Sequence, residues 1–326
     1  MSRKKIDDVT EEFWEEEVDA TNKELIEDFL SQRHLSPNTL KQYTSALKIF
    51  SKWAHDHARN LSIVKMKPRH ALQYQDWLID KGLSGHGIQM KRSAVSSLCN
   101  FIELYYSDEY PSFRNIYTKA IPNVEKSTTK EKVPLTESER NKIINTLKES
   151  GDLQKLAFFM TAYSTAGRRA ELVQLKKEIA NYDEYKNGEG NGQGFYLSHN
   201  VRGKGKGRGG KQIKLMIGKD AMEAIKDWLD YRGEDDCEFI FISKRGDKIN
   251  GITPNTVNLW VDSFGKIIGR KINPHLIRAT RSTDIVVNEE KDVRFAQILL
   301  NHESSETTTK HYVIRDENED LGDIFN

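Results

Sequence analysis

The sequence predicts a mainly α-helical protein of two domains, the second of which carries one small antiparallel sheet. Helical hydrophobic periodicity runs through residues 22–106, and a polar stretch with three prolines follows at 107–134. Three short runs rich in Ile, Phe and Tyr then occur at 192–199, 211–218 and 237–243, which is typical of strands. A chain of 326 residues is long enough for two domains with separate cores.

The first long helix of the N-terminal domain is expected in "LSPNTLKQYTSALKIFSKW". Ser36 is in the position of an N-cap and Pro37 is in the first turn, where its missing N–H is harmless. The apolar residues that follow recur at helical spacing and predict one buried stripe. That stripe consists of Leu40, Tyr43, Leu47, Phe50 and Ala54, and it leaves Lys41, Lys48 and Lys52 outside.

A second segment, "LSGHGIQMKRSAVSSLCNF", repeats this design from Ser84 onward. Its inward residues are Ile88, Val95, Leu98 and Ile102, and Lys91 and Arg92 are expected outside. Between the two segments, residues 70–82 predict another helix that ends at Gly82. Together the helices indicate a small all-α domain with a basic face.

The composition divides the rest of the chain. Residues 107–134 are interpreted as an exposed interdomain linker. Thr136 and Glu139 then form a capping box that opens a second domain, in which residues 153–179 predict a buried helix, a turn and another helix. The expected division is an acidic N-terminal extension at 1–21, a helical domain at 22–106, the linker at 107–134, a second domain at 135–313 and an acidic tail at 314–326.

The formal net charge of +1 hides strong local charge. Residues 1–30 hold four basic and eleven acidic side chains, whereas residues 31–132 hold sixteen basic and eight acidic ones. Residues 201–219 hold seven Lys or Arg and no acid, and residues 315–326 hold one basic and five acidic side chains. Basic blocks between acidic ends are typical of a chain that binds a polyanion and whose own acidic ends shield the basic blocks. Solvated helix faces whose charges balance by chance are the alternative.

Several function classes are disfavoured. Cys99 and Cys237 are the only cysteines, without CxxC spacing, so neither a disulfide framework nor structural zinc is expected. The sequence lacks HExxH, GxSxG and an acidic cluster suited to two-metal chemistry. No apolar run approaches the roughly 18 residues of a membrane span, and the N-terminus turns acidic where a signal peptide is apolar. We therefore expect a cytoplasmic protein with no metal, no cofactor and no membrane partner.

A glycine-rich basic loop lies between two of the strand candidates. Its cations are Arg202, Lys204, Lys206 and Arg208, interleaved with glycines. The spacing matches neither common nucleotide-binding motif, so a hairpin tip that presents cations to a phosphate backbone is favoured. A mobile solvated loop is the alternative.

Two further segments place cations where an anion can bind. In "NPHLIRATRST", Asn273 caps a helix that carries His275 and Arg278 on one face near its N-terminus, which favours a phosphate. In "TAGRRAEL", Arg168 and Glu171 are three residues apart, so the carboxylate is positioned to orient the guanidinium. Taken singly, each arrangement also occurs as ordinary surface charge.

The stretch "LLNHESSETTTKHYV" contains His302 and Tyr312. Tyrosine has a pKa near 10 and is a poor nucleophile at neutral pH, so a reactive Tyr312 needs cationic neighbours. The ordered set Arg168, Lys204, His275, Arg278, His302 and Tyr312 resembles the motifs of the tyrosine recombinase, or phage integrase, family. The matching residues are "RRAEL", "GKG" at 203–205, "HLIR" and "LLNH" with Tyr312 ten residues on, and the resemblance covers about residues 22–313.

The resemblance implies a SAM-like core-DNA-binding domain followed by a mostly helical catalytic domain with a small sheet. It implies a site-specific DNA recombinase in which Tyr312 forms a 3′-phosphotyrosine. Arg168 and Arg278 would hold the phosphate, His275 and His302 would donate hydrogen bonds or move protons, Lys204 would be the general acid, and Glu171 would support Arg168. The sequence departs from the family pattern at Ala166-Gly167, Ala279 and Asn301, and by one extra residue before Tyr312. The first motif could also shift so that Arg169 enters the site in place of Arg168.

Double-stranded DNA is the implied partner. A homo-tetramer on DNA is expected, with a monomer or dimer when free, and an accessory directionality factor in a bacterial or phage-infected cell. The expected DNA contacts are Lys41, Lys48, Lys52, Lys91, Arg92, Arg202, Lys206 and Arg208. Two alternatives stay open: a DNA-binding regulator that has lost strand transfer, and a type IB topoisomerase. The sequence does not specify the DNA site or distinguish integration, excision and resolution.

Overall fold

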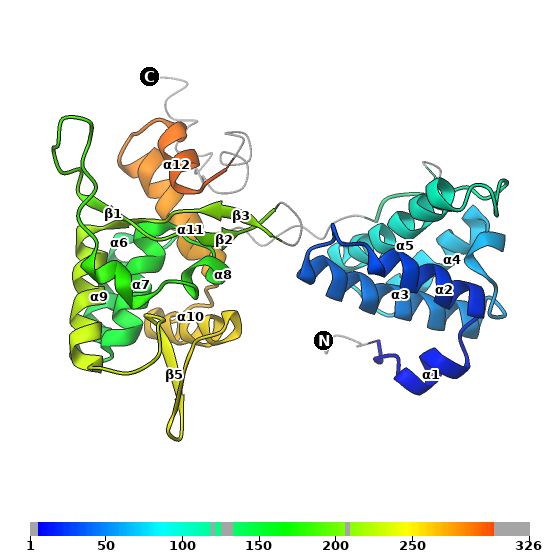
Figure 1. The fold of residues 1–326 in the computed structure, drawn as a ribbon, viewed down its shortest axis with the longest axis horizontal. Helices are drawn as coiled ribbons and strands as arrows, with labels where there is room; N and C mark the ends of the chain where they lie inside the picture. Colours follow the sequence, from blue (N-terminus) through cyan, green and yellow to red (C-terminus); the bar gives the residue numbers. More distant parts are fainter. Residues whose placement is uncertain (1–5, 119–120, 125–132, 206–208, 303–326) are drawn as a thin grey trace. The chain divides into compact units, whose positions relative to one another are not determined.

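The chain folds into two units with separate cores, formed largely by residues 1–130 and by residues 131–326. The computed structural model describes residues 6–118, 121–124, 133–205 and 209–302. The first unit is built from helices α1 to α5, and the second combines helices with short antiparallel strand pairs (Figure 1).

Capping residues set where the long helices of the first unit begin. The Oγ atoms of Ser36 and Ser84 accept hydrogen bonds from the backbone N–H groups of Thr39 and Gly87, both at 3.2 Å. Both helices therefore start where the sequence predicts, and Gly82, with a φ of +73°, follows the end of the helix between them. The elements are α1 (Glu11–Glu16), α2 (Ala20–Ser31), α3 (Pro37–His57), the 3₁₀ turn η1 (Ile63–Lys65), α4 (Pro68–Asp80) and α5 (Gly85–Tyr105).

The segment after α5 packs on the first unit. Phe113, Ile116 and Ile121 are 5%, 1% and 7% exposed and belong to the same hydrophobic core as the helices. The expectation of an exposed linker is therefore wrong for this stretch. Its proline and polar content reflects irregular backbone, and the three buried apolar side chains help to hold that backbone on the helices.

The second unit begins with the predicted capping box, in which Glu139 N–H donates to Thr136 Oγ1 at 3.2 Å and Thr136 N–H donates to Glu139 Oε2 at 2.9 Å. Its helices are α6 (Glu137–Glu149), α7 (Leu153–Thr165), α8 (Arg169–Leu172), α9 (Lys219–Arg232), α10 (Pro254–Ile268), α11 (Pro274–Thr283) and α12 (Val293–Leu299). A 3₁₀ turn, η2 (Lys177–Asn181), follows α8, and a π-helical turn, η3 (Asp284–Asn288), follows α11.

The strands pair in three antiparallel sets. β1 (Phe195–Leu197) pairs with β4 (Met216–Gly218), and β2 (Val201–Gly203) pairs with β3 (Lys211–Ile213). The Ser198 N–H donates to the Leu215 carbonyl at 3.0 Å between these two sets, so they form successive parts of one hairpin. β5 (Ile242–Arg245) pairs instead with β6 (Lys248–Gly251), in a hairpin that projects from the second unit (Figure 1).

Helix α7 is central to the second unit, where it contacts α6, α9 and α11. The Phe158 ring meets the Phe241 and Trp260 rings edge-on at 5.2 and 5.3 Å, and Phe159 meets Phe264 at 5.4 Å. These contacts join α7 to α10 and to the segment that leads into β5. The C-terminal end of α7, where the first site motif begins, therefore rests on a packed core.

The predicted fold class is confirmed, with one change in the sheet. The third strand candidate, 237–243, contributes only its last residues to β5, and it pairs with the strand after it rather than with the earlier hairpin. Within the part of the chain that the structure describes, each helix is too short or too polar to cross a membrane.

Candidate active site

The first site motif starts at a tight turn between α7 and α8. Ala166 ends α7 in the left-handed conformation, with a φ of +45°, and Gly167 follows it. A Cβ atom on Gly167 would lie 2.8 Å from Leu172 Cδ2, so a side chain at this position would clash. The turn delivers Arg168 to the N-cap position of α8.

Arg168 is fixed by a buried carboxylate, as the sequence predicts. Glu171 is 1% exposed, its Oε1 accepts from Arg168 Nη1 at 2.9 Å, and its Oε2 accepts from the Arg168 backbone N–H at 2.8 Å. Arg169 turns elsewhere, and its Nη1 donates to Asn258 Oδ1 on α10 at 2.8 Å. The two neighbouring arginines therefore diverge, and only Arg168 reaches the buried Glu171.

Strand β2 lies over the same carboxylate. A Cβ atom on Gly203 would be 3.5 Å from Glu171 Oε1 and 3.2 Å from the Lys211 carbonyl, so glycine allows the close approach. Lys204, the next residue, is exposed. The hairpin thus carries Lys204 on the strand that covers the Arg168–Glu171 pair.

Gln174, which was not predicted as a site residue, holds β2 in this place. Its Oε1 accepts from the Arg202 N–H at 2.9 Å, and its Nε2 donates to the Arg202 carbonyl at 3.0 Å. One amide side chain therefore satisfies both backbone groups of the residue two before Lys204. A lone glutamine just after a short helix carries no sequence signal for such a role.

Helix α11 supplies the second pair of site residues. Asn273 Oδ1 accepts from the Leu276 N–H at 3.0 Å and caps the helix as predicted. His275 is exposed in the first turn, and Arg278 follows one turn later on the same face. Arg278 is 2% exposed, and by residue volume it is the largest of the fully buried side chains in the described part of the chain.

Arg278 connects three segments that are distant in sequence. Its Nη1 donates to the Ala166 carbonyl, and its Nη2 donates to the Leu300 carbonyl at 2.7 Å. The same Nη2 lies 3.1 Å from His302 Nε2. Because a guanidinium only donates hydrogen bonds, His302 Nε2 is the acceptor in this contact.

Helix ends supply the acceptors around this buried cation. Ala166 follows the last residue of α7, and Leu300 follows the last residue of α12, where the partial negative charge of a helix collects. Asn301, with a φ of +52°, turns the chain left-handed directly after Leu300. Ala166 and Asn301, two of the departures from the family pattern, thus lie at left-handed turns that aim carbonyl groups at Arg278. Asparagine adopts this conformation readily, whereas alanine adopts it at a cost of about 1 kcal/mol.

Two family models match the sequence of the chain. The model of the phage integrase family matches residues 134–319, and that of the phage integrase N-terminal SAM-like domain matches residues 23–104. The chain belongs to the phage integrase family. Its members include the tyrosine recombinases, to which the ordered site motifs point.

Individual relatives agree with this assignment. The chain is 36% identical to the SPbeta prophage-derived recombinase-like protein YomM of Bacillus subtilis (strain 168), over 98% of this chain and 95% of the relative. It is 27% identical to the tyrosine recombinase XerA of Pyrococcus horikoshii, over 90% of both chains. In fold it is similar to the XerH site-specific recombinase bound to a palindromic difH substrate, with a TM-score of 0.68, 17% identity and 94% of both chains covered.

Tyr312, the expected nucleophile, lies outside the described residues, as do Lys206, Arg208 and the acidic tail at 314–326. The structure pairs Arg168 with Glu171 and Arg278 with His302, and the Ala166 carbonyl connects the two pairs. Lys204 follows β2 beside Glu171, and His275 is one turn from Arg278. The placement of Tyr312 relative to them stays a prediction.

The expected DNA contacts of the first unit lie in three different environments. Lys41 is exposed on α3, whereas Lys48 and Lys52 are engaged by side chains of α1, as described below. Lys91 and Arg92 are 9% and 8% exposed, so the expectation that they point outward is wrong. Burial lowers the pKa of Lys91.

The segment after α5 explains this burial. Arg92 Nη1 donates to the Pro122 carbonyl at 2.9 Å, and its guanidinium lies 5.3 Å from the centre of the Tyr117 ring. Helical periodicity identifies the apolar stripe of α5 but gives no sign that irregular backbone covers its other side. In the second unit, Arg202 is exposed on β2, as expected.

A second polar cluster lies beside α11 and was also missed. Asp284 is 4% exposed, its Oδ2 accepts from the Tyr163 hydroxyl at 2.6 Å, and the same oxygen lies 3.1 Å from Arg140 Nη1. Burial, followed by the hydrogen bond to Asp284, raises the pKa of Tyr163 to about 12. The cluster ties α6, α7 and the end of α11 together, and its members are too far apart in sequence to be linked by spacing.

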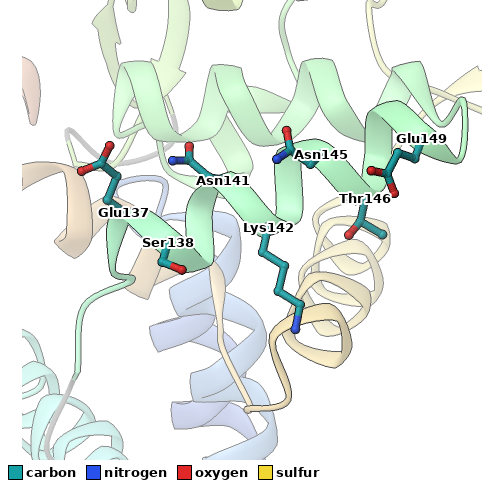
Figure 2. A pocket seen from close by; sticks show the side chains of 7 residues that line it. All are labelled: Glu137, Ser138, Asn141, Lys142, Asn145, Thr146 and Glu149. Carbon is teal, nitrogen blue, oxygen red and sulfur yellow. The ribbon is translucent and has the colours of Figure 1, made fainter.

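A shallow pocket of about 730 Å³ runs along the polar face of α6 (Figure 2). Its lining residues are Glu137, Ser138, Asn141, Lys142, Asn145, Thr146 and Glu149. All of them come from one helix, their charges are mixed, and none is a predicted site residue. The pocket is therefore separate from the candidate site.

Proposed function

We propose that the chain is a site-specific DNA recombinase that cleaves and rejoins strands through a 3′-phosphotyrosine on Tyr312. The observation that carries the proposal is the position of Arg278. Its guanidinium contacts the turn that presents Arg168, the end of α12 and His302 at once. Arg278 thereby contacts His302 and the turn that presents Arg168, which supports a shared site although these residues are spread over more than 130 positions of the chain.

The chemistry follows from the charges at this place. His275 or His302 takes the proton of the Tyr312 hydroxyl as Tyr312 Oη attacks the phosphorus. The bond from phosphorus to the 5′-oxygen breaks, and Lys204 delivers a proton to the leaving oxygen. Arg168 and Arg278 stabilise the charge on the non-bridging oxygens, and His275 and His302 donate hydrogen bonds to them or move protons. Each preorganised donor of this kind contributes about 2.7–4 kcal/mol in the transition state.

Because the intermediate keeps a phosphoester bond, the 5′-hydroxyl of a second strand can reverse the step without ATP. Exchange of all strands between two duplexes requires four nucleophiles, one for each strand. A homo-tetramer on DNA, assembled from monomers or dimers, fits this requirement. The acting compartment would be the cytoplasm of a bacterial or phage-infected cell, where a directionality factor would choose between forward and reverse reactions.

The test begins with the DNA that the protein binds in its native cell, recovered after cross-linking. A nicked duplex of that sequence, in which the cleaved end diffuses away, should trap a covalent protein–DNA complex. Tyr312→Phe should abolish the complex. Tyr231→Phe is the matched control, because Tyr231 is 72% exposed on α9 and should leave adduct formation unchanged.

Two other outcomes would contradict the proposal. Sequence-specific binding without an adduct would indicate a DNA-binding regulator that has lost strand transfer. Relaxation of supercoiled DNA without dependence on a particular site would indicate a type IB topoisomerase.

Gln174 should matter for the proton delivered by Lys204. We expect Gln174→Ala to slow adduct formation about tenfold, because the loss of two hydrogen bonds to Arg202 costs about 1–2 kcal/mol of positioning energy. DNA affinity should change less than about twofold. On a duplex with sulfur in place of the bridging 5′-oxygen at the scissile phosphate, the defect should disappear, since a thiolate leaves without a general acid.

Gln193→Ala is the control, because Gln193 is exposed in the loop before β1. Gln193→Ala should leave the rate of adduct formation unchanged on both the oxygen and the sulfur substrate. A Gln174→Ala defect of equal size on the oxygen and sulfur substrates would show that Gln174 acts on stability or binding rather than on Lys204.

A further inference from the structure

Helix α1 is firmly seated on the first unit. Trp14 and Val18 are 4% and 8% exposed in its core, and Trp14 Nε1 donates to Glu27 Oε1 at 3.3 Å. The helix precedes residue 23, where the match to the SAM-like domain begins. It is therefore an addition to that domain, and four of its six residues are glutamates.

Residues 11–17, which comprise α1 and its C-cap, cover two lysines and a histidine on α3. Lys48, Lys52 and His55 are spaced by four and three residues and so share one face. Both carboxylate oxygens of Glu11 accept from Lys48 Nζ, at 2.7 and 2.8 Å, and Glu17 Oε2 lies 3.6 Å from His55 Nε2.

Aromatic rings hold the same cations in place. Lys48 Nζ lies 5.1 Å from the centre of the Trp14 ring, and Lys52 Nζ lies 4.4 Å from the centre of the Phe13 ring. Phe13 also meets the His55 ring edge-on at 5.1 Å. These contacts fix the cations independently of the carboxylates.

We propose that this α3 surface, formed by Lys48, Lys52 and His55, binds DNA phosphates, and that Glu11 and Glu17 occupy it in the free protein. The proposal rests on the proposed function of the chain as a DNA recombinase. A carboxylate that receives two charge-assisted hydrogen bonds from one ammonium group makes the same contact as a phosphate with two free oxygens. The acidic helix thus takes the place of DNA backbone.

The exposures show how DNA could displace the acids. The Lys48 side chain is 18% exposed, whereas that of Glu11 is 80% exposed; for His55 and Glu17 the values are 33% and 56%. The carboxylates therefore lie on the solvent side of the cations, and they can swing away while Trp14 stays packed. Such exposed pairs stabilise a fold by about 0–1 kcal/mol, so the fold does not depend on them.

The test compares two pairs of substitutions in the full-length chain. Glu11→Gln with Glu17→Gln removes the two acids within residues 11–17 that contact Lys48 and His55. Asp56 of α3 itself, whose carboxylate lies 3.3 Å from Lys52 Nζ and 2.8 Å from His55 Nδ1, is kept in all variants. Glu12→Gln with Glu16→Gln makes the same change in net charge on the same helix, at exposed positions for which the described structure shows no ion pair. The probe is a fluorescent duplex of random sequence, titrated over a range of salt concentrations.

The first pair should raise the affinity about five- to tenfold near 0.1 M salt and steepen the salt dependence by about one to two in slope, since each phosphate contact contributes about 0.9. The control pair should change affinity less than about twofold. Lys48→Gln with Lys52→Gln should weaken binding by the wild-type chain and should cancel the gain in the Glu11→Gln, Glu17→Gln background.

Equal gains from the two glutamate pairs would overturn the proposal, because the effect would then be long-range charge. A gain that survives removal of both lysines would overturn it as well. Either result, with wild-type binding and adduct formation intact, would leave the proposed recombinase function standing. Failure of every variant to bind DNA would overturn both.

Discussion

Arg278→Lys is expected to slow formation of the covalent protein–DNA complex by about 10² to 10³, the usual effect of removing one preorganised donor from a developing oxyanion. The charge is kept, but the forked geometry is lost. A single ammonium group cannot reach the Ala166 carbonyl, the Leu300 carbonyl and a phosphate oxygen together. The measurement is the single-turnover rate on the nicked duplex, with protein in excess over DNA.

Arg281→Lys is the matched control. Arg281 is on the same helix, and its side chain pairs with Glu289 rather than with the site. Lysine preserves that ion pair, so the rate should stay within about threefold of wild type. Similar rates for the two variants would contradict the role that we assign to Arg278. An Arg278→Lys chain that binds DNA normally but cleaves slowly would place the loss in the transition state.

Sequence predicted the helices of both units well because their signals are local. Ser36, Ser84, Thr136 and Asn273 each cap a helix within the next three residues, and this is the range over which a short polar side chain acts. The strands were less certain. The run at 237–243 has strand composition, but its partner is chosen by the turn at Gly246, which a composition argument does not weigh.

The order of the site motifs could be predicted from the sequence, but the contacts that surround the site residues could not. Arg168 and Glu171 are three residues apart on one short helix, so their contact follows from spacing. The acceptors of Arg278 are backbone carbonyls, which leave no trace in the sequence. The orientation of Lys91 failed for a related reason, since the backbone that covers it belongs to a segment whose composition suggested exposure.

The long-range polar contacts of Asp284 likewise escaped the sequence, and their removal has the largest expected effect on stability. Asp284→Ala leaves Arg140 and the Tyr163 hydroxyl without this acceptor in a site where the two charged side chains are 15% and 6% exposed. Breaking a buried pair from one side costs about 3 kcal/mol or slightly more. For a unit of this size, we expect the thermal midpoint of the second unit to fall by about 6–12 °C.

Two controls separate the buried charge from the loss of a side chain. Asp284→Asn keeps an oxygen that can accept from the Tyr163 hydroxyl, so it should lose roughly half as much stability. Asp262→Ala makes the same deletion at an exposed position of α10 and should change stability by less than about 0.5 kcal/mol. If Asp284→Ala and Asp262→Ala have the same thermal midpoint, the cluster contributes little to stability, and the contacts of Arg278 must hold α11 in position. If Asp284→Ala melts early but cleaves at the wild-type rate at low temperature, the cluster supports the fold alone.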